Sequence, residues 1–156
     1  MSEKFASVTE TGVASGTNKT ALNLFDGLAT PTRRLGIFYL TVSSVATPAD
    51  QAAKFYLGRT SAVGTEGSGY TPVNLDPGGP AGEGDAGIGA FSGEPTYTSS
   101  KELLVFSVNQ RVTFQWYACF PGAEFYVAAT QNNGLGLKTS SSTSTQAHEV
   151  TTHHVE

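Results

Sequence analysis

The sequence predicts an all-β protein, an antiparallel β-sandwich of jelly-roll type. The main observation is the alternation of apolar and polar residues in segments separated by turn residues. In residues 112–118, Val112, Phe114 and Trp116 fall on one side of an extended chain and the intervening residues on the other. Such a period of two is typical of a strand with one buried face. A buried face requires a second sheet against it, so a sandwich is expected, with Trp116 in its core.

The composition also favours strands and turns. The chain has 156 residues, enough for one domain, and 18 of them are glycine. Charged residues make up only 14%, against about 25% in a typical domain. Glycine and β-branched residues weaken helices. The net charge is -4, and without a basic stripe to displace counterions from phosphates no nucleic-acid partner is expected.

Each expected strand is an apolar or alternating run that ends at a turn signal. Pro121-Gly122 interrupts the pattern after residue 118, and Asn132-Asn133-Gly134 is a strong turn signal. Residues 47–57 have a partly helical composition, but Gly58 and Gly64 would end a helix within two turns. We therefore expect a loop leading into a strand there. The expected strands cover residues 35–45, 53–60, 103–108, 112–118, 125–127 and 147–155.

Two segments are expected to lie outside the sandwich, which we assign to residues 21–156. Residues 1–20 are small and polar apart from Phe5, and predict an extended N-terminal arm that is dispensable for folding and used for attachment. Residues 64–93 are rich in glycine and proline, and predict a long loop. Such a loop is either an exposed connection or a contact with a neighbouring subunit.

Three patterns that resemble functional motifs are interpreted as structural. Residues 82–87 match a dinucleotide-binding fingerprint, but prolines precede them and no amphipathic helix follows. Asp76, Glu83 and Asp85 offer oxygen ligands, but their spacing fits no calcium loop. Cys119 stands alone between apolar neighbours and is expected to be a small buried residue without a catalytic role. We expect no catalytic, cofactor-binding or metal-binding residue.

The three histidines, His148, His153 and His154, lie in the expected last strand. His148 and His154 share one side of that strand, about 20 Å apart, so they cannot hold one ion within a chain. An ion shared on an oligomer axis remains geometrically open. The strand has so little apolar surface that we expect exposed or interface-lining histidines, and packing against the same strand of neighbouring subunits.

Much of the chain beyond residue 33 resembles a group of small tailed-bacteriophage virion proteins, the head decoration or cement proteins. The similar stretches are Ala46–Phe55, Gly64-Thr65, Thr71-Pro72, Leu75–Pro77, Asn109–Trp116 and Asn133–Leu137. The resemblance implies a jelly-roll sandwich, a homotrimer and a structural role without catalysis. It implies as partners the major capsid protein of a phage head and further copies of this chain.

The resemblance also implies a location on the outer capsid surface, after synthesis in the bacterial host cytoplasm. The sequence itself offers no secretion signal and no run of apolar residues long enough for a transmembrane helix, so no membrane partner is expected. Three alternatives stay open. One is a phage tail or head-fibre component. Another is a carbohydrate-binding module in which Tyr70, Tyr97 or Tyr126 stacks on sugar. The third is a small hydrolase with an unrecognised site.

Overall fold

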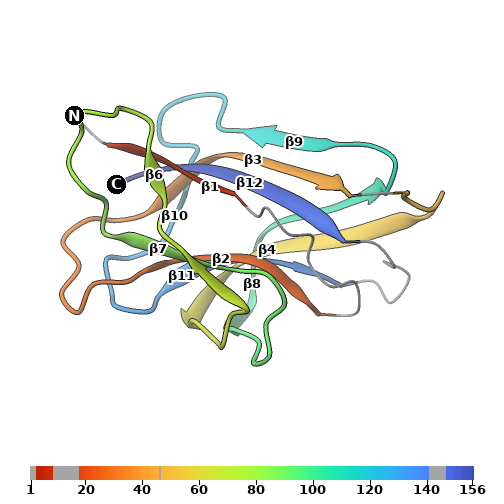
Figure 1. The fold of residues 1–156 in the computed structure, drawn as a ribbon, viewed down its shortest axis with the longest axis horizontal. Coiled ribbons are helices and arrows are strands. Elements are labelled where there is room, and N and C mark those ends of the chain that lie inside the picture. Colours follow the sequence, from red (N-terminus) through yellow and green to blue (C-terminus); the bar gives the residue numbers. More distant parts are fainter. Residues whose placement is uncertain (1–2, 9–17, 46, 141–146) are drawn as a thin grey trace.

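The computed structural model describes residues 3–8, 18–45, 47–140 and 147–156, and these form two antiparallel six-stranded sheets packed as a β-sandwich (Figure 1). Sheet A consists of β1 (Lys4–Val8), β3 (Gly36–Ser44), β6 (Val73–Asn74), β9 (Phe114–Tyr117), β10 (Phe125–Tyr126) and β12 (His148–Val155). Sheet B consists of β2 (Thr20–Asp26), β4 (Ala52–Ala62), β5 (Ser68–Tyr70), β7 (Gly84–Ile88), β8 (Thr96–Asn109) and β11 (Gly134–Thr139). The predicted fold class is confirmed.

The two sheets draw their strands from the whole length of the described chain. Sheet A has the order β10–β3–β12–β1–β6, with β9 also paired to β3, and sheet B has the order β5–β7–β2–β11–β4–β8. The chain passes from one sheet to the other at each step from β1 to β4. It does so again from β8 to β9, from β10 to β11 and from β11 to β12. In the described residues no helix is present, and hence none that is long and apolar enough to cross a membrane.

The core lies between the sheets and takes alternate residues from each strand. In β4 the buried residues Ala53, Phe55 and Leu57 alternate with more exposed ones, as period-two geometry requires. Strands β2, β3, β11 and β12 contribute in the same way, through Leu22, Leu24, Ile37, Leu40, Val42, Leu135, Leu137 and Val150. The strands expected at residues 35–45, 53–60 and 147–155 are confirmed as β3, β4 and β12.

The expectation that residues 1–20 form an arm outside the sandwich is wrong for Lys4–Val8. These residues form β1, which pairs with β12 on one side and with β6 on the other. Phe5 is only 1% exposed, and its ring stacks on that of His154 with centroids 5.4 Å apart. A short polar segment thus belongs to the sandwich because its one aromatic residue is buried there. Residues 9–17 lie outside the described part of the chain.

The segment 64–93 was expected to be a long loop, and this expectation is wrong, because the segment contains β5, β6 and β7. Strand β7 pairs with β2 along its whole length. Its glycines serve close packing as well as turning. A Cβ placed on Gly87 would lie 3.1 Å from the Phe91 ring, tighter than side chains normally pack, so glycine is needed where that ring crosses the strand.

The expectation that the last strand needs neighbouring subunits is also wrong. Strand β12 lies in the middle of sheet A, paired with β3 on one side and β1 on the other. Its buried residues include His148 and His154, which are 2% and 0% exposed. The His148 ring packs edge-on against Phe55 and lies near the Ser44 hydroxyl. Aromatic neighbours and hydrogen-bonding groups replace the apolar surface that the sequence lacks.

Replacing Phe5 with alanine should lower the free energy of unfolding by about 3–5 kcal/mol, the range for removing a buried phenylalanine. The physical reason is the cavity left between β1 and His154. Chemical denaturation with far-ultraviolet circular dichroism measures the change. Tyr117→Ala, at a residue 64% exposed, serves as the control and should change stability little. Equal stability of the Phe5 variant and the parent chain would place β1 outside the cooperative fold.

Candidate functional site

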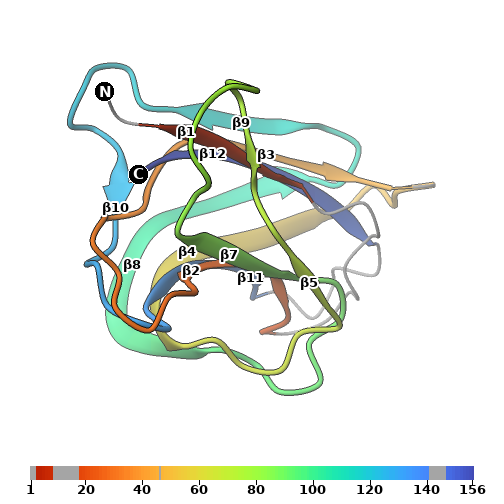
Figure 2. The same ribbon diagram turned by 60° about the vertical axis from the view of Figure 1, so that its left-hand side comes forward.

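One side of the sandwich is incompletely covered. Strand β8 is the last strand of sheet B, and β9 and β10 end sheet A on the same side. Figure 2 shows β8 as a long curved strand at this side. Half-buried apolar side chains follow the boundary between the sheets, and we call this set the open edge: Leu104, Phe106, Phe114, Trp116 and Phe125.

Aromatic stacking joins the two sheets along the open edge. The rings of Phe106 in β8 and Phe114 in β9 are parallel, with centroids 3.6 Å apart. Phe106 also stacks on the buried Phe55 at 5.2 Å, and Trp116 stacks on Phe125 at 4.3 Å. Each stack has one partner near the surface, so further aromatic area is available for contact with another molecule.

Trp116 was expected in the core, but it is half-buried at the open edge. Its orientation is as expected, since Phe114 and Trp116 point inward while Gln115 and Tyr117 point out. Val112 is 56% exposed instead of buried, because the strand begins only at Phe114. The predicted orientation of the β9 side chains is therefore right. Trp116 is partly exposed because β9 pairs with β3 on one side and no described strand lies on its other side.

Further apolar residues are exposed beside the open edge. Val105 lies between Leu104 and Phe106 in β8, on the outer side of sheet B opposite Tyr56, and is 47% exposed. Val112, Tyr117 and Phe120 are also exposed. Val105 and Tyr117 point away from the core, on the outer faces of sheets B and A, so exposed apolar residues lie on both strands beside the open edge.

A cluster of charged groups closes one end of the sandwich. The Glu156 carboxylate accepts hydrogen bonds from the backbone N–H groups of Glu83 and Gly84, and lies 3.4 Å from His154 Nε2. Arg33 lies 3.7 Å from both Glu83 and Glu156. Burial would raise the pKa of Glu156, but the hydrogen bonds with His154, Glu83 and Gly84 hold it below its ordinary value.

Asp26 is buried near this charged cluster without a compensating partner. Among the described residues neither of its carboxylate oxygens has a hydrogen-bond partner. Burial, followed by repulsion from Glu83 and Glu156, raises the pKa of Asp26 to about 6. At neutral pH the fold therefore carries an unpaired buried negative charge, which is destabilising.

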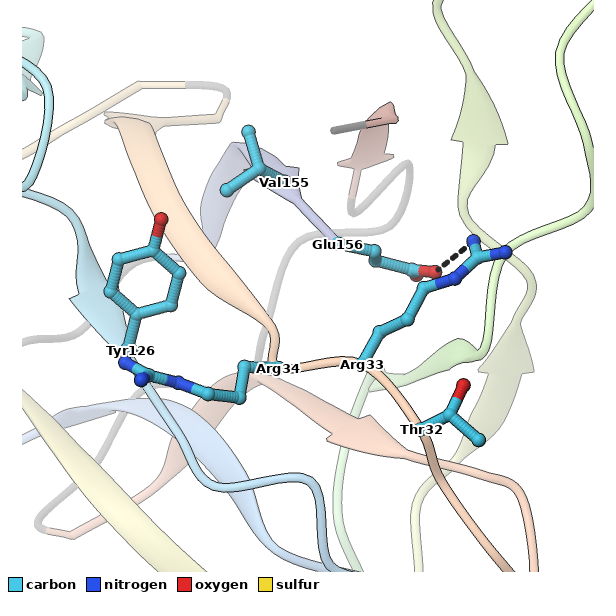
Figure 3. Close-up of a pocket in the computed structure, with 6 residues that line it drawn as sticks. All are labelled: Thr32, Arg33, Arg34, Tyr126, Val155 and Glu156. Carbon is cyan, nitrogen blue, oxygen red and sulfur yellow. Dashed lines mark ion pairs between the residues drawn. The ribbon is translucent and has the colours of Figure 1, made fainter. Parts of the chain in front are cut away.

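A groove beside β10 is the second candidate site. Its lining consists of Thr32, Arg34, Arg59, Tyr126, Val127, Ala128 and Ala129, and it encloses about 520 Å³; we call it the Tyr126 groove. A neighbouring hollow of about 500 Å³ (Figure 3) shares Thr32, Arg34 and Tyr126 with the groove and is also lined by Arg33, Val155 and Glu156. The Arg34 guanidinium lies 4.6 Å from the centroid of the Tyr126 ring.

The remaining candidates from the sequence have structural roles or none. Residues 82–87 lead into β7 and do not open a helix. Asp76 accepts a hydrogen bond from the Gly78 backbone, whereas Glu83 accepts hydrogen bonds from Thr32 and Arg33. In the described part of the chain no group of three acidic, histidine or cysteine residues is placed to hold a metal ion.

Two expectations about single residues need correction. Cys119 is exposed, not buried, because the chain leaves β9 after Tyr117 and turns, which ends the alternation. His148 and His154 are not exposed or interface-lining, because both face the core, whereas His153 packs half-buried against Phe38 and Tyr39. His148 and His154 do share one side of β12, as expected.

The three tyrosines proposed to stack on sugar are all engaged within the chain. The Tyr97 hydroxyl hydrogen-bonds Thr20, and burial raises the pKa of Tyr97. A Cβ on Gly136 would lie 2.5 Å from that hydroxyl, so the ring lies directly on the strand. Tyr70 packs against the core, and Arg34 covers a face of Tyr126.

The Tyr126 groove and the charged cluster were not predicted from the sequence. Arg33-Arg34 were visible as adjacent basic residues, but their partners Glu83, Tyr126 and Glu156 are far away in sequence. Comparison with known protein families, with curated proteins and with solved structures found no match to this chain.

Replacing Asp26 with asparagine should stabilise the protein at neutral pH but not in acid. Because the pKa of Asp26 is raised in the folded state, its stabilising protonated form is complete below about pH 4 and is lost as the pH rises through about 6. The stability difference between variant and parent should thus grow between pH 4 and pH 6 and stay constant above. Urea denaturation across this range measures it. A difference independent of pH would show that Asp26 titrates as in the unfolded chain.

Proposed function

We propose that this chain is a virion structural protein, a capsid decoration or cement protein that binds the outer surface of a phage head as a homotrimer. The observation that carries the proposal is the open edge between β8 and β9. It presents stacked aromatic residues and exposed aliphatic ones on a protein with few charges. The proposal assigns the protein a mechanical role and no catalytic step.

The residue types at the open edge support contact with protein. Aromatic side chains are enriched at the buried centres of protein interfaces, and charged residues are depleted there. Strand β8 spans 14 residues and ends its sheet, so within the described residues no strand pairs with the other side of its backbone. Long edge strands of this kind are sites of association unless they are covered.

A closed trimer is a natural way to cover the open edge. If the edge of one copy packs against a different surface of the next, a rotation that closes produces a ring in which every edge is covered. The route through the last strand is excluded because β12 is already paired on both sides. The resemblance to trimeric decoration proteins favours three copies.

The mechanism follows from multivalency. A trimer that bridges neighbouring copies of the major capsid protein adds contacts that resist internal pressure, and its weak contacts act together through effective concentration. After synthesis in the bacterial cytoplasm, the protein would attach to the assembled head. A tail or head-fibre position requires the same open edge and differs only in the partner. The carbohydrate-binding alternative is weakened, since Tyr70, Tyr97 and Tyr126 all have partners within the chain.

Val105→Glu should convert the trimer to monomers, because it places a charge on the edge strand β8 beside the open edge without disturbing the core. Sedimentation velocity at micromolar concentrations and neutral pH measures the effect. Leu28→Glu is a matched control, as Leu28 is 46% exposed but lies in the connection between β2 and β3. The control should remain trimeric. A parent chain that sediments as a monomer would refute self-association, and a trimeric Val105→Glu would move the interface elsewhere.

Attachment is tested on purified heads of a phage that encodes this chain. The labelled parent protein should co-sediment with heads that lack it and raise their resistance to heat. Leu28→Glu should do the same, whereas Val105→Glu should bind much more weakly because it lacks multivalency. Binding to tails alone would favour the fibre alternative, and saturable binding to glycans but not to particles would favour the carbohydrate-binding alternative.

A further inference from the structure

The Tyr126 groove carries two positive side chains, Arg34 and Arg59, that no carboxylate of the described residues neutralises. Four arginines lie in the sequence. Arg33 is paired with Glu83 and Glu156, and Arg111 with Asp50. Within the described part of the chain, neither Arg34 nor Arg59 has a carboxylate within ion-pair distance. On a protein of net charge -4, these two side chains make the groove a local site of positive charge.

Both guanidinium groups are held in place before any ligand arrives. Arg59 donates from Nε and Nη2 to the backbone oxygen of Tyr126, at 3.2 and 3.0 Å, and among the described residues its Nη1 has no hydrogen-bond partner. Arg34 lies over the Tyr126 ring. Side chains fixed in this way lose little conformational entropy when they bind an anion. The arrangement is therefore suited to a planar anionic group.

The remaining lining limits the kind of anion. Val127, Ala128 and Ala129 provide a small apolar wall beside the guanidinium groups, which suits the methylene groups of an aspartate or glutamate side chain. A sugar ring or a nucleobase needs a free aromatic face, but Arg34 occupies a face of Tyr126. Nucleic acid also requires a longer series of cations than two.

We propose that the Tyr126 groove binds a carboxylate side chain of an acidic peptide segment from another protein. Arg34 and Arg59 receive the carboxylate through charge-assisted hydrogen bonds, and the apolar wall packs against its methylene groups. None of the groove residues belongs to the open edge, so this inference does not depend on trimer formation. Complementary charge would also select acidic partners over basic ones.

The test is calorimetric titration with an N-acetylated, C-amidated hexaglutamate peptide at low salt. The parent protein should bind it, binding should weaken as salt is raised, and the matching hexaglutamine peptide should not bind. Arg34→Gln and Arg59→Gln should each weaken binding about tenfold, as expected for one charge-assisted hydrogen bond. Arg111→Gln, at an exposed arginine elsewhere, is the control and should bind like the parent.

Arg34 is exposed, so its variant tests the site even if loss of the Arg59 hydrogen bonds destabilises the fold. Equal affinity of the parent and Arg34→Gln for hexaglutamate, or equal affinity of the parent for the glutamine peptide, would overturn the proposal. Tighter binding of inorganic phosphate or glucuronate than of the peptide would also overturn it and assign another anion to the groove. Sedimentation tests self-association separately, so failure of one proposal is distinguishable from failure of the other.

Discussion

The structure depends on the position of β12 in the middle of sheet A. Its pairing with β3 and β1 forces polar side chains into the interior. His148 and His154 are accommodated by Phe55 and Phe5, one from each sheet. Burial lowers the pKa of His148, so the interior favours its neutral form, and its contribution to stability is lost as the pH falls below about 6.5. The raised pKa of Asp26 acts in the opposite direction between about pH 4 and pH 6, so the two groups oppose each other in mildly acidic solution.

The same strand organises the end of the sandwich that holds the groove. Glu156 directly follows β12 and binds the backbone at Glu83 and Gly84 and the Arg33 side chain. This fixes the connection that carries Arg34 toward Tyr126. The open edge has a different origin. There both sheets end, at β8 and at β9 and β10, and no further described strand covers the aromatic residues between them. The Tyr126 groove thus lies at an end of the sandwich that charged groups close, whereas the open edge lies where the two sheets end side by side.

The alternation of side chains made the fold class predictable from the sequence, and β-forming residues and turn signals predicted the strands at residues 35–45 and 53–60. Of the longest strand, β8, only residues 103–108 were expected. It also gave the orientation of Phe114 and Trp116. Alternation cannot say how many neighbours a strand has, which is why the exposure of Trp116 and the position of β1 were missed. Composition misled in two places, since polar residues in β12 and glycines in β7 proved to be interior. The groove depends on contacts between Arg34, Arg59 and Tyr126 that no local pattern reveals.

The central claim is that copies of this chain meet at the open edge, and Trp116 reports on it directly because it is the single tryptophan. Its fluorescence emission should be followed from nanomolar to high micromolar protein concentration. Our account predicts a shift to shorter wavelength as concentration rises, with the same midpoint as the sedimentation change, because association removes water from the half-buried indole. Emission that stays constant across a concentration range in which the protein trimerises would contradict the claim.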